Sequence, residues 1–196
     1  MNYLTYLPKF VYRQEVDKEN NVQAIYTTPD YLLNTANYLR NNQECQYKQL
    51  MDITAVDYPE KEKRFLVVYH FLSVSKNKRL MVKVWTDEIT PLPSLFQLYS
   101  CATWYERETY DMFGVYFLGN PDMRRILTDY GFEGHPLRKD FPLTGFTEVR
   151  YDDEEKRILS EPVQMSQQYR TFNFQSPWSH TPNLNVPNPE DIKKVK

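Results

Sequence analysis

The sequence predicts an α+β fold: a mainly antiparallel sheet of about four strands with flanking helices, then a long ordered irregular loop, a short hairpin and an extended C-terminal tail. Three observations support this prediction. Helical spacing of apolar residues recurs in segments 32–39 and 92–113. All five glycines lie between Gly114 and Gly145. Apolar residues alternate with period two, as in strands, in segments 22–27, 47–58, 64–74 and 79–86.

The last three of these strands are joined by short polar segments, 59–63 and 75–78. Strands joined so closely are expected to pair antiparallel, because a parallel pair needs a longer crossover. In the first of them, Met51, Ile53 and Ala55 are expected on one face. The middle strand, 64–74, is apolar on both faces, which predicts a central position with helical cover.

The first helix is expected to begin at Thr28-Pro29, an N-cap candidate followed by a proline at the first helical position. It is expected to end at Asn41-Asn42. A second helical segment is indicated by Leu92, Leu95, Phe96 and Tyr99, which are spaced i, i+3, i+4 and i+7.

The third helix is expected to run from Thr103 to Phe113. Thr103 and Glu106 have the spacing of a capping box, in which each side chain satisfies a backbone N–H at the start of the helix. Gly114 follows as a candidate left-handed cap.

Composition excludes several classes of protein. The 196 residues contain 24 Lys and Arg against 26 Asp and Glu, so a general nucleic-acid binder is not expected. The longest apolar run, 65–72, is too short to span a membrane, so membrane association is expected through partners. The N-terminal residues resemble neither a signal peptide nor a transit peptide.

No cofactor or metal site is expected in this chain. Cys45 and Cys101 are too few for a four-cysteine iron–sulfur cluster, and the three histidines are isolated in sequence. His70 is expected in the core, and His135 in a hydrogen-bonding role within a loop. The phosphate-binding patterns GxGxxG and GxxxxGK[ST] are both lacking.

Glu106, Glu108 and Asp111 are close enough in sequence for general acid–base chemistry. Arg107 lies four residues before Asp111, however, so an ion pair within the helix is the favoured interpretation. Catalysis by these carboxylates remains the weaker alternative.

The segment from 115 onward contains compact charge groups, Arg124-Arg125 and Arg138-Lys139-Asp140, among eight apolar residues that need burial. An ordered loop of this length without periodicity is usually functional. The favoured hypothesis is a rigid loop laid onto another protein, and the alternative is a loop that covers its own domain. Reversal of Arg124 and Arg125 to Glu is expected to block assembly and to leave the domain folded.

A hairpin is expected at 147–159 around the acidic turn 152–155, followed by an extended aromatic segment that wraps a partner or is disordered. Its aromatic residues are Tyr169, Phe172, Phe174 and Trp178. The expected organisation is an α+β domain at 1–114, the loop, hairpin and wrapping segment at 115–178, and a Pro/Asn-rich tail at 179–196.

Residues 106–127, ERETYDMFGVYFLGNPDMRRIL, resemble the signature of the 30 kDa subunit of respiratory complex I, the proton-pumping NADH:ubiquinone oxidoreductase. The resemblance continues through TDYGFEGHPLRKDFPLTGF to SPW at 176–178. One departure is Asn120, where the family usually has His.

The resemblance implies a cofactor-free core subunit of the peripheral arm, without a catalytic site of its own, that packs against the 49 kDa subunit near the quinone-reducing module. FMN and iron–sulfur clusters would belong to neighbouring subunits. The implied location is the matrix side of the mitochondrial inner membrane, or alternatively the cytoplasmic side of a bacterial inner membrane.

The predicted partner interface combines these charge groups and aromatic residues. It consists of Glu106, Arg107, Glu108, Asp111, Arg124, Arg125, Arg138, Lys139, Asp140, Tyr169, Phe172, Phe174 and Trp178. Two other classes stay open: a free-standing soluble enzyme that uses Glu108, Asp111 and His135, and a module that binds small anions through the Arg/Gly loop.

Overall fold

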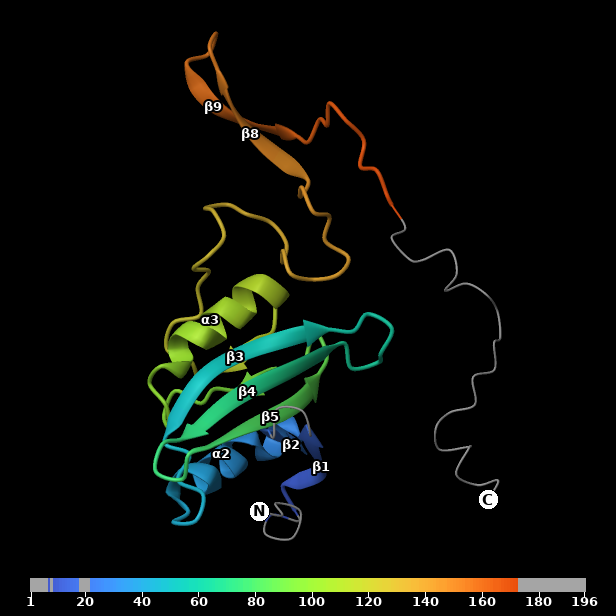
Figure 1. Cartoon of the computed structure of the whole chain (residues 1–196). Coiled ribbons are helices and arrows are strands. Elements are labelled where there is room, and N and C mark those ends of the chain that lie inside the picture. Colours follow the sequence, from blue (N-terminus) through green and yellow to red (C-terminus); the bar gives the residue numbers. More distant parts are fainter. Residues whose placement is uncertain (1–6, 8, 18–21, 173–196) are drawn as a thin grey trace, which may run out of the picture. The chain divides into compact units, whose positions relative to one another are not determined.

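The computed structural model describes residues 7, 9–17 and 22–172 (Figure 1). Its contacts divide the chain into two compact units, Met1–Thr147 and Glu148–Lys196. The predicted first boundary lies at Gly114 instead. The difference arises because the loop after Gly114 is hydrogen-bonded to the helix before it, as described below.

The first unit is built on a five-stranded sheet of order β1-β2-β5-β4-β3. The predicted antiparallel pairs β3–β4 and β4–β5 are confirmed, whereas β2 and β5 pair in parallel. The edge strand β1 was not predicted, because its polar residues obscure the alternation. The strands are β1 (Val11–Asp17), β2 (Val22–Thr27), β3 (Gln49–Asp57), β4 (Phe65–Ser73) and β5 (Lys78–Thr86).

Strand β3 contains a β-bulge that changes which residues face the core. The register with β4 shifts between Leu50 and Asp52. Leu50 is therefore buried with Ile53 and Ala55, while Met51 is 41% exposed. The predicted common face of Met51 and Ile53 is wrong, because the extra residue of a bulge breaks the period of two.

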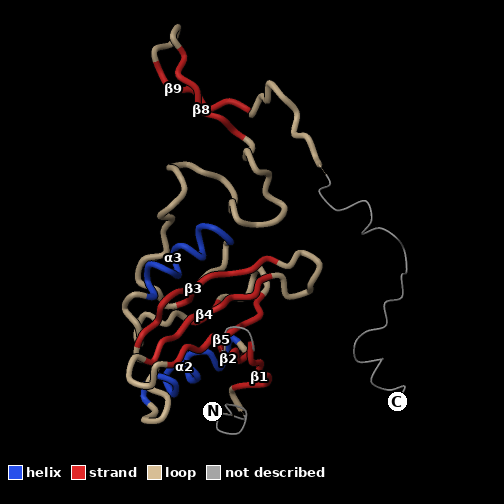
Figure 2. Tube along the Cα trace, in the orientation of Figure 1, coloured by secondary structure: helices blue, strands red, loops and turns tan. Residues whose placement is uncertain are grey.

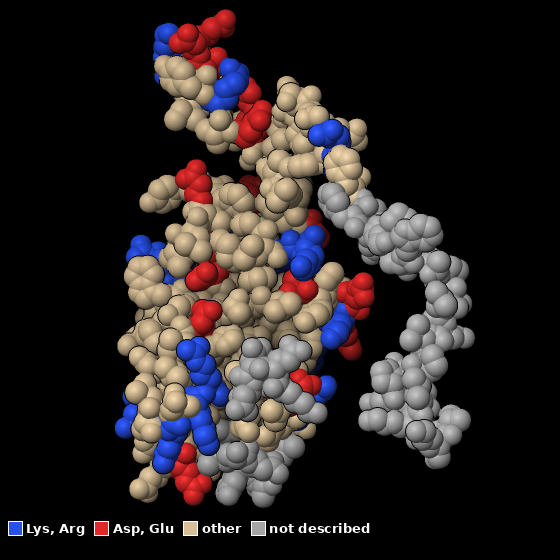
Figure 3. All heavy atoms as spheres, in the orientation of Figure 1, with Lys and Arg blue, Asp and Glu red and all other residues tan. Residues whose placement is uncertain are grey.

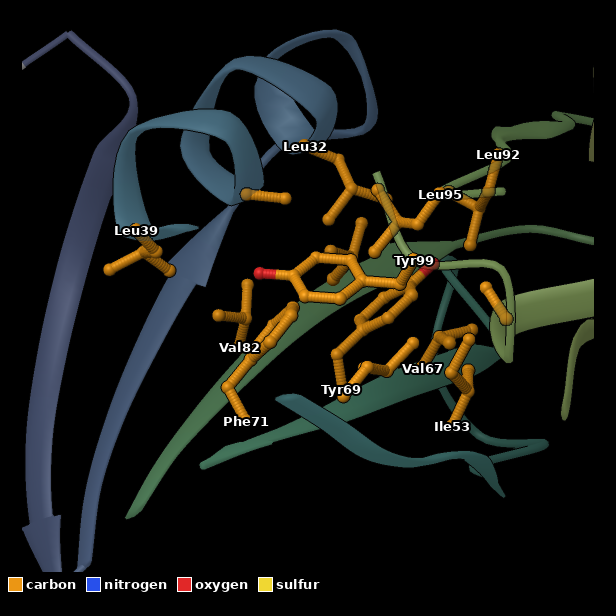
Figure 4. Packing of buried hydrophobic residues seen from close by; sticks show 14 of the residues in the cluster. Leu32, Leu39, Ile53, Val67, Tyr69, Phe71, Val82, Leu92, Leu95 and Tyr99 are labelled. Atoms are coloured by element: carbon orange, nitrogen blue, oxygen red, sulfur yellow. The ribbon is translucent and has the colours of Figure 1, made fainter. Parts of the chain in front are cut away.

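The first helical segment begins as a 3₁₀ turn, η1 (Pro29–Tyr31), and continues as α2 (Leu32–Asn41). The predicted end at Asn41-Asn42 is confirmed. The predicted N-cap is not, because the Thr28 hydroxyl makes no capping hydrogen bond. Figure 4 shows Leu32 and Leu39 lying over the sheet, where they pack in the main core cluster with residues of β3, β4 and β5.

The predicted helix at 92–99 is wrong. Leu92 begins a two-residue strand, β6 (Leu92–Pro93), which pairs in parallel with β7 (Phe117–Leu118). The N–H groups of Leu98 and Tyr99 both bond to the carbonyl of Leu95, which makes a single turn. The residues that suggested a helix are nevertheless buried, apart from Phe96.

Helix α3 (Ala102–Phe113) packs against β3 and ends at Gly114, whose φ of 83° confirms the predicted left-handed cap. Side chains of α2 and α3 contribute to the main core only. On the other face of the sheet, Tyr26, Leu66 and Val68 form a second cluster, against which only Met81 and Trp85 of the sheet pack. The predicted helical cover on both faces of the middle strand is therefore wrong for the described residues.

The second unit begins with a hairpin. Strands β8 (Thr147–Asp152) and β9 (Arg157–Pro162) form a two-stranded sheet around the predicted acidic turn. Arg150 Nη2 lies 2.7 Å from Glu161 Oε1 across the pair. Tyr169 and Phe172 are 55% and 60% exposed. The predicted contacts of Phe174 and Trp178 lie outside the described residues.

Gly114→Ala is expected to lower the free energy of unfolding by about 2 kcal/mol or more, because a side chain at positive φ alone costs about 1–2 kcal/mol. The new Cβ would also lie 2.5 Å from Arg138 Nη2 and 2.7 Å from His135 Nε2. Gly119→Ala is the matched control, since its φ is 93° but no atom of the described residues, apart from its two chain neighbours, lies within 4 Å of its Cβ position. Urea unfolding of both variants measures the difference, and equal losses would contradict the steric argument.

Candidate functional site

The candidate site is the glycine-rich loop, defined here as residues 119–146. Figure 2 shows it as irregular chain between β7 and β8, without a helix or strand of its own. Backbone N–H and C=O groups in such a segment need other partners. Side chains of α3 provide several of them.

Asp111 is the main anchor of this loop. Its side chain is fully buried, and one oxygen, Oδ2, accepts the consecutive amide N–H groups of Ile126, Leu127 and Thr128 at 3.2, 2.8 and 3.0 Å. The other oxygen, Oδ1, accepts the Thr128 hydroxyl at 2.8 Å and Arg125 Nη1 at 3.2 Å. The carboxylate therefore fixes one turn of the loop onto the helix.

The surroundings of Asp111 keep it charged. Burial acts to raise its pKa, but the amide and hydroxyl donors of Ile126, Leu127 and Thr128 outweigh burial and hold the pKa below its usual range. Arg125 also donates to the carbonyl of Gly134 at 2.9 Å and so ties together two parts of the loop. The predicted intrahelical pair between Arg107 and Asp111 is wrong, because the partner of Asp111 comes from the loop.

Glu106 is buried on the same helix but has no cationic partner among the described residues. Its carboxylate accepts hydrogen bonds from Ser94 Oγ, the Leu95 amide and Asn120 Nδ2, at 2.7, 2.8 and 2.8 Å. Burial raises the pKa of Glu106 in spite of these donors. The predicted capping box is wrong, because Glu106 bonds to these groups and the Thr103 hydroxyl has no hydrogen-bond partner in the part of the chain that the structure describes.

Asn120 links this buried carboxylate to the start of the loop. Its Nδ2 donates to Glu106, and its Oδ1 accepts the amide N–H of Asp122 at 3.0 Å. The structure thus gives a role to the position where the family resemblance led us to expect His. The asparagine satisfies one lone pair of Glu106 and closes a turn.

The other two charged residues of the helix differ in environment. Arg107 is 6% exposed and donates from Nε to the carbonyl of Arg124 at 3.1 Å. Glu108 is exposed, and its side chain forms no hydrogen bond or ion pair with any described residue. The three carboxylates therefore do not converge, which argues against shared acid–base chemistry.

His135 and Arg138 attach the loop to the end of α3. His135 Nδ1 lies 3.0 Å from the carbonyl oxygen of Asp111, which confirms the predicted hydrogen-bonding role, and burial lowers the pKa of its ring. Arg138 Nε donates to the carbonyl of Phe113 at 2.6 Å. These two bonds satisfy carbonyls in the last turn of the helix, where intrahelical donors are lacking.

An ion-pair cluster around Asp57 holds the rest of the charged loop segment. Asp57 accepts both Nε and Nη2 of Arg64, at 2.7 and 2.9 Å, and the amide of Lys139 at 2.8 Å. The Arg64 bonds are the main reason that the pKa of Asp57 is lowered. Arg64 also pairs with Asp140 at 3.1 Å, and Glu88 pairs with both Arg64 and Arg138 at 2.6 and 3.6 Å.

The charged residues predicted for a partner interface thus bind mainly to their own domain. Arg124, Lys139 and Asp140 remain exposed. Reversal of both Arg124 and Arg125 would disturb the Asp111 anchor, so the predicted intact fold of that double variant is not expected. Whether these residues touch a partner stays a prediction.

The loop instead exposes apolar side chains, which we call the apolar loop surface: Leu127, Tyr130, Leu137, Leu143 and Phe146. Tyr130 is fully exposed and Leu143 is 89% exposed. Within the loop, the Phe141 ring lies 5.8 Å from that of Phe132 and 5.4 Å from that of Phe146. All of these residues except Leu143 are among the eight apolar residues of the loop that the sequence predicts to need burial, but the sequence does not show that the domain leaves them uncovered.

Other classes of site receive little support from the described part of the chain. No group of three or more His, Cys, Asp or Glu side chains there is arranged to hold a metal ion. None of the described helices has the length and apolar character needed to cross a membrane.

A domain that uses its charges internally and presents a fixed apolar loop is typical of a subunit of a larger assembly. The family itself follows from comparison with known proteins. The family described as "Respiratory-chain NADH dehydrogenase, 30 Kd subunit" matches residues 25–147, and the chain belongs to it.

Related proteins support this assignment. NADH-ubiquinone oxidoreductase subunit 9 of Reclinomonas americana is 52% identical over 170 residues, covering 87% of this chain and 83% of the relative. A subunit of the NADH-quinone oxidoreductase of Methylobacterium radiotolerans is 59% identical over 144 residues, covering 74% and 67%. NADH dehydrogenase [ubiquinone] iron-sulfur protein 3 of Candida albicans is 55% identical, covering 87% and 60%.

A solved structure has a similar fold. A chain of the archaeal membrane-bound sulfane sulfur reductase, a respiratory membrane complex, superposes with a TM-score of 0.60 and 30% identity. The match covers 71% of this chain and 81% of the archaeal one.

Asp111→Asn is expected to lower the free energy of unfolding at neutral pH by about 3 kcal/mol, because it breaks a buried pair with Arg125. The lowered pKa of Asp111 stabilises the fold above the pKa of the unfolded state, about 4, and this contribution is lost as the pH falls through the folded pKa. The variant should therefore lose less stability on acidification than the wild type. Denaturant unfolding at several pH values tests this, with the exposed Asp153→Asn as control.

Asn120→Ala is expected to cost about 1–3 kcal/mol, since it removes a donor from a buried carboxylate. Because the folded pKa of Glu106 is raised, its ionisation destabilises the fold as the pH rises through that pKa. Loss of a donor raises this pKa further, so the cost should be larger at neutral pH than below about pH 4, where Glu106 is neutral in both states. A pH-independent cost would contradict this role, and Asn120→His is expected to restore part of the stability.

Proposed function

We propose that this chain is a structural subunit of an NADH:ubiquinone oxidoreductase, and that it supports electron transfer from NADH to ubiquinone by scaffolding the quinone-reducing module. The observation that carries the proposal is an apolar loop surface fixed from beneath by buried charges. The names of the relatives from Reclinomonas americana and Methylobacterium radiotolerans support the choice of enzyme.

The physical basis is preorganisation. Ordering a loop on binding reduces affinity, so a loop that is already fixed binds its partner more tightly. Asp111 and Asp57 fix the loop at two separate places, through the amides of 126–128 and of Lys139. Exposed leucine and aromatic side chains on such a rigid base provide the anchors that dominate protein interfaces.

We further propose that the chain binds no cofactor and that FMN and iron–sulfur clusters reside in neighbouring subunits. Support comes from the two cysteines of the whole chain, which are too few for a four-cysteine cluster. One of them, Cys45, is buried, whereas Cys101 is exposed. The words "iron-sulfur protein" in the name of the Candida albicans relative are a statement about that relative and not about this chain.

The proposed partners are other complex I subunits, in particular the 49 kDa subunit, in the peripheral arm. The proposed location is the matrix side of the mitochondrial inner membrane, with the cytoplasmic side of a bacterial inner membrane as the alternative. Mitochondrial and bacterial relatives support one or the other.

The first test is the native size of the chain in a mild detergent extract, with a stain for NADH dehydrogenase activity on the same gel. Co-migration with a very large NADH-oxidising band is the expected result. A small inactive species would contradict the proposed function.

Leu143→Asp combined with Tyr130→Asp is expected to abolish incorporation of the chain into this band, because charges would be buried under the partner without compensation. The unfolding free energy of the free chain should change by less than about 0.5 kcal/mol, since both side chains are exposed. Ile89→Asp is the matched control, because Ile89 is 90% exposed but lies outside the loop. Normal incorporation of the double variant would exclude the apolar loop surface as the interface.

A further inference from the structure

A cavity of about 580 Å³ lies against the outer face of the sheet, on the side that α2 and α3 leave uncovered. Asp52, His70 and Met81 are direct neighbours across β3, β4 and β5 and form a row along it. His70 is therefore not a core residue, as the sequence analysis expected, but a half-buried residue of a cavity. The other lining residues are Val22, Met51, Phe71, Arg79 and Leu80.

Basic side chains gather beside this cavity. Lys76, Lys78 and Arg79 are exposed in and after the turn between β4 and β5, and Lys48 is exposed next to the start of β3. None of the four pairs with a described carboxylate. Figure 3 shows Lys and Arg side chains together at this end of the sheet, at the lower left, in a chain whose net charge is −2.

We propose that this basic end of the sheet docks an acidic segment of a neighbouring polypeptide. The carboxylates of the segment would pair with Arg79 and the adjacent lysines, and an apolar side chain would enter the cavity. Uncompensated cations of one sign attract a partner of opposite charge. Arg79 is the best placed of them, because it lines the cavity and a guanidinium binds a carboxylate through two parallel bonds.

The composition of the cavity favours a peptide over a phosphate or a lipid headgroup. Met51, Met81 and Val22 provide an apolar lining that a phosphate would not use. Asp52 places a negative charge in the same cavity, which repels a second anion at that point. A segment that has its carboxylates at the rim and an apolar side chain inside avoids both conflicts.

This surface is separate from the apolar loop surface, and the proposal rests on the proposed function only in that a neighbouring polypeptide is present. The test uses the intact assembly and the free full-length chain. Both are treated with an amine acetylating reagent, and separately with a carbodiimide, which couples lysine to a carboxylate in contact with it. Mass spectrometry then locates the modified residues.

The expected result is loss of acetylation at Lys76 and Lys78 on assembly, and coupling of at least one of them to Asp or Glu of another chain. In the variant Lys78→Glu with Arg79→Glu, coupling and protection of Lys76 should be lost, while the free chain keeps its stability. Lys63→Glu is the matched control, since it reverses an exposed lysine in the turn at the other end of β4.

Three outcomes would overturn the proposal. The first is equal acetylation of Lys76 and Lys78 in the free and assembled chain, and the second is coupling to carboxylates of this chain only. The third is that interchain coupling is absent and the free chain instead sediments with vesicles of phosphatidylcholine and cardiolipin in a manner that depends on Arg79. Absence of the chain from the large NADH-oxidising band would instead contradict the proposed function. Equal acetylation in a chain that co-migrates with this band contradicts the docking proposal alone.

Discussion

The glycine-rich loop depends on the carboxylate of Asp111. A loop without ladder or helix hydrogen bonds leaves many polar backbone groups to be satisfied. Asp111 accepts three consecutive amides on one oxygen, and Arg125 balances its charge on the other. Burial of an unpaired charge would be costly, so both halves of this arrangement are needed. The apolar loop surface is held in place because of this interaction beneath it.

Glu106 and Asp111 show how environment separates two carboxylates on one helix. Both are fully buried. Burial acts to raise both pKa values, but the amide and hydroxyl donors of the loop hold the pKa of Asp111 below its usual range, whereas burial outweighs the neutral donors of Glu106 and raises its pKa. The nearby Tyr69 hydroxyl is buried without a hydrogen-bond partner among the described residues, and its pKa is raised by burial and by the charge of Glu106. Asp111, with its charged partner, fixes the loop strongly onto α3. Glu106, with its neutral donors, joins β6, α3 and Asn120.

The sequence predicted those features whose cause is local. Strands β3 to β5, the end of α2, the Gly114 cap and the β8–β9 hairpin all follow from periodicity or turn residues. The failures have distant causes. Ser94 and Leu95 bond to Glu106 twelve and eleven residues away, and Asp111 bonds to residues fourteen to seventeen positions later. Because such partners are not visible in a short window, the internal partners of these charge groups could not be predicted, and their contact with another subunit stays a prediction.

Charges that are buried within the domain and charges that are exposed differ in their salt dependence. Asp111 and Asp57 are fully buried, so salt screens their pairs little. Contacts through Leu143 and Tyr130 would be apolar and also insensitive to moderate salt. Attraction through Arg79 and its neighbouring lysines acts between exposed charges and weakens within a Debye length of about 8 Å at physiological ionic strength. Two surfaces that differ in this way in salt dependence can act one after the other. The basic end of the sheet would guide the approach of a partner, and the rigid apolar loop surface would then stabilise the assembled state.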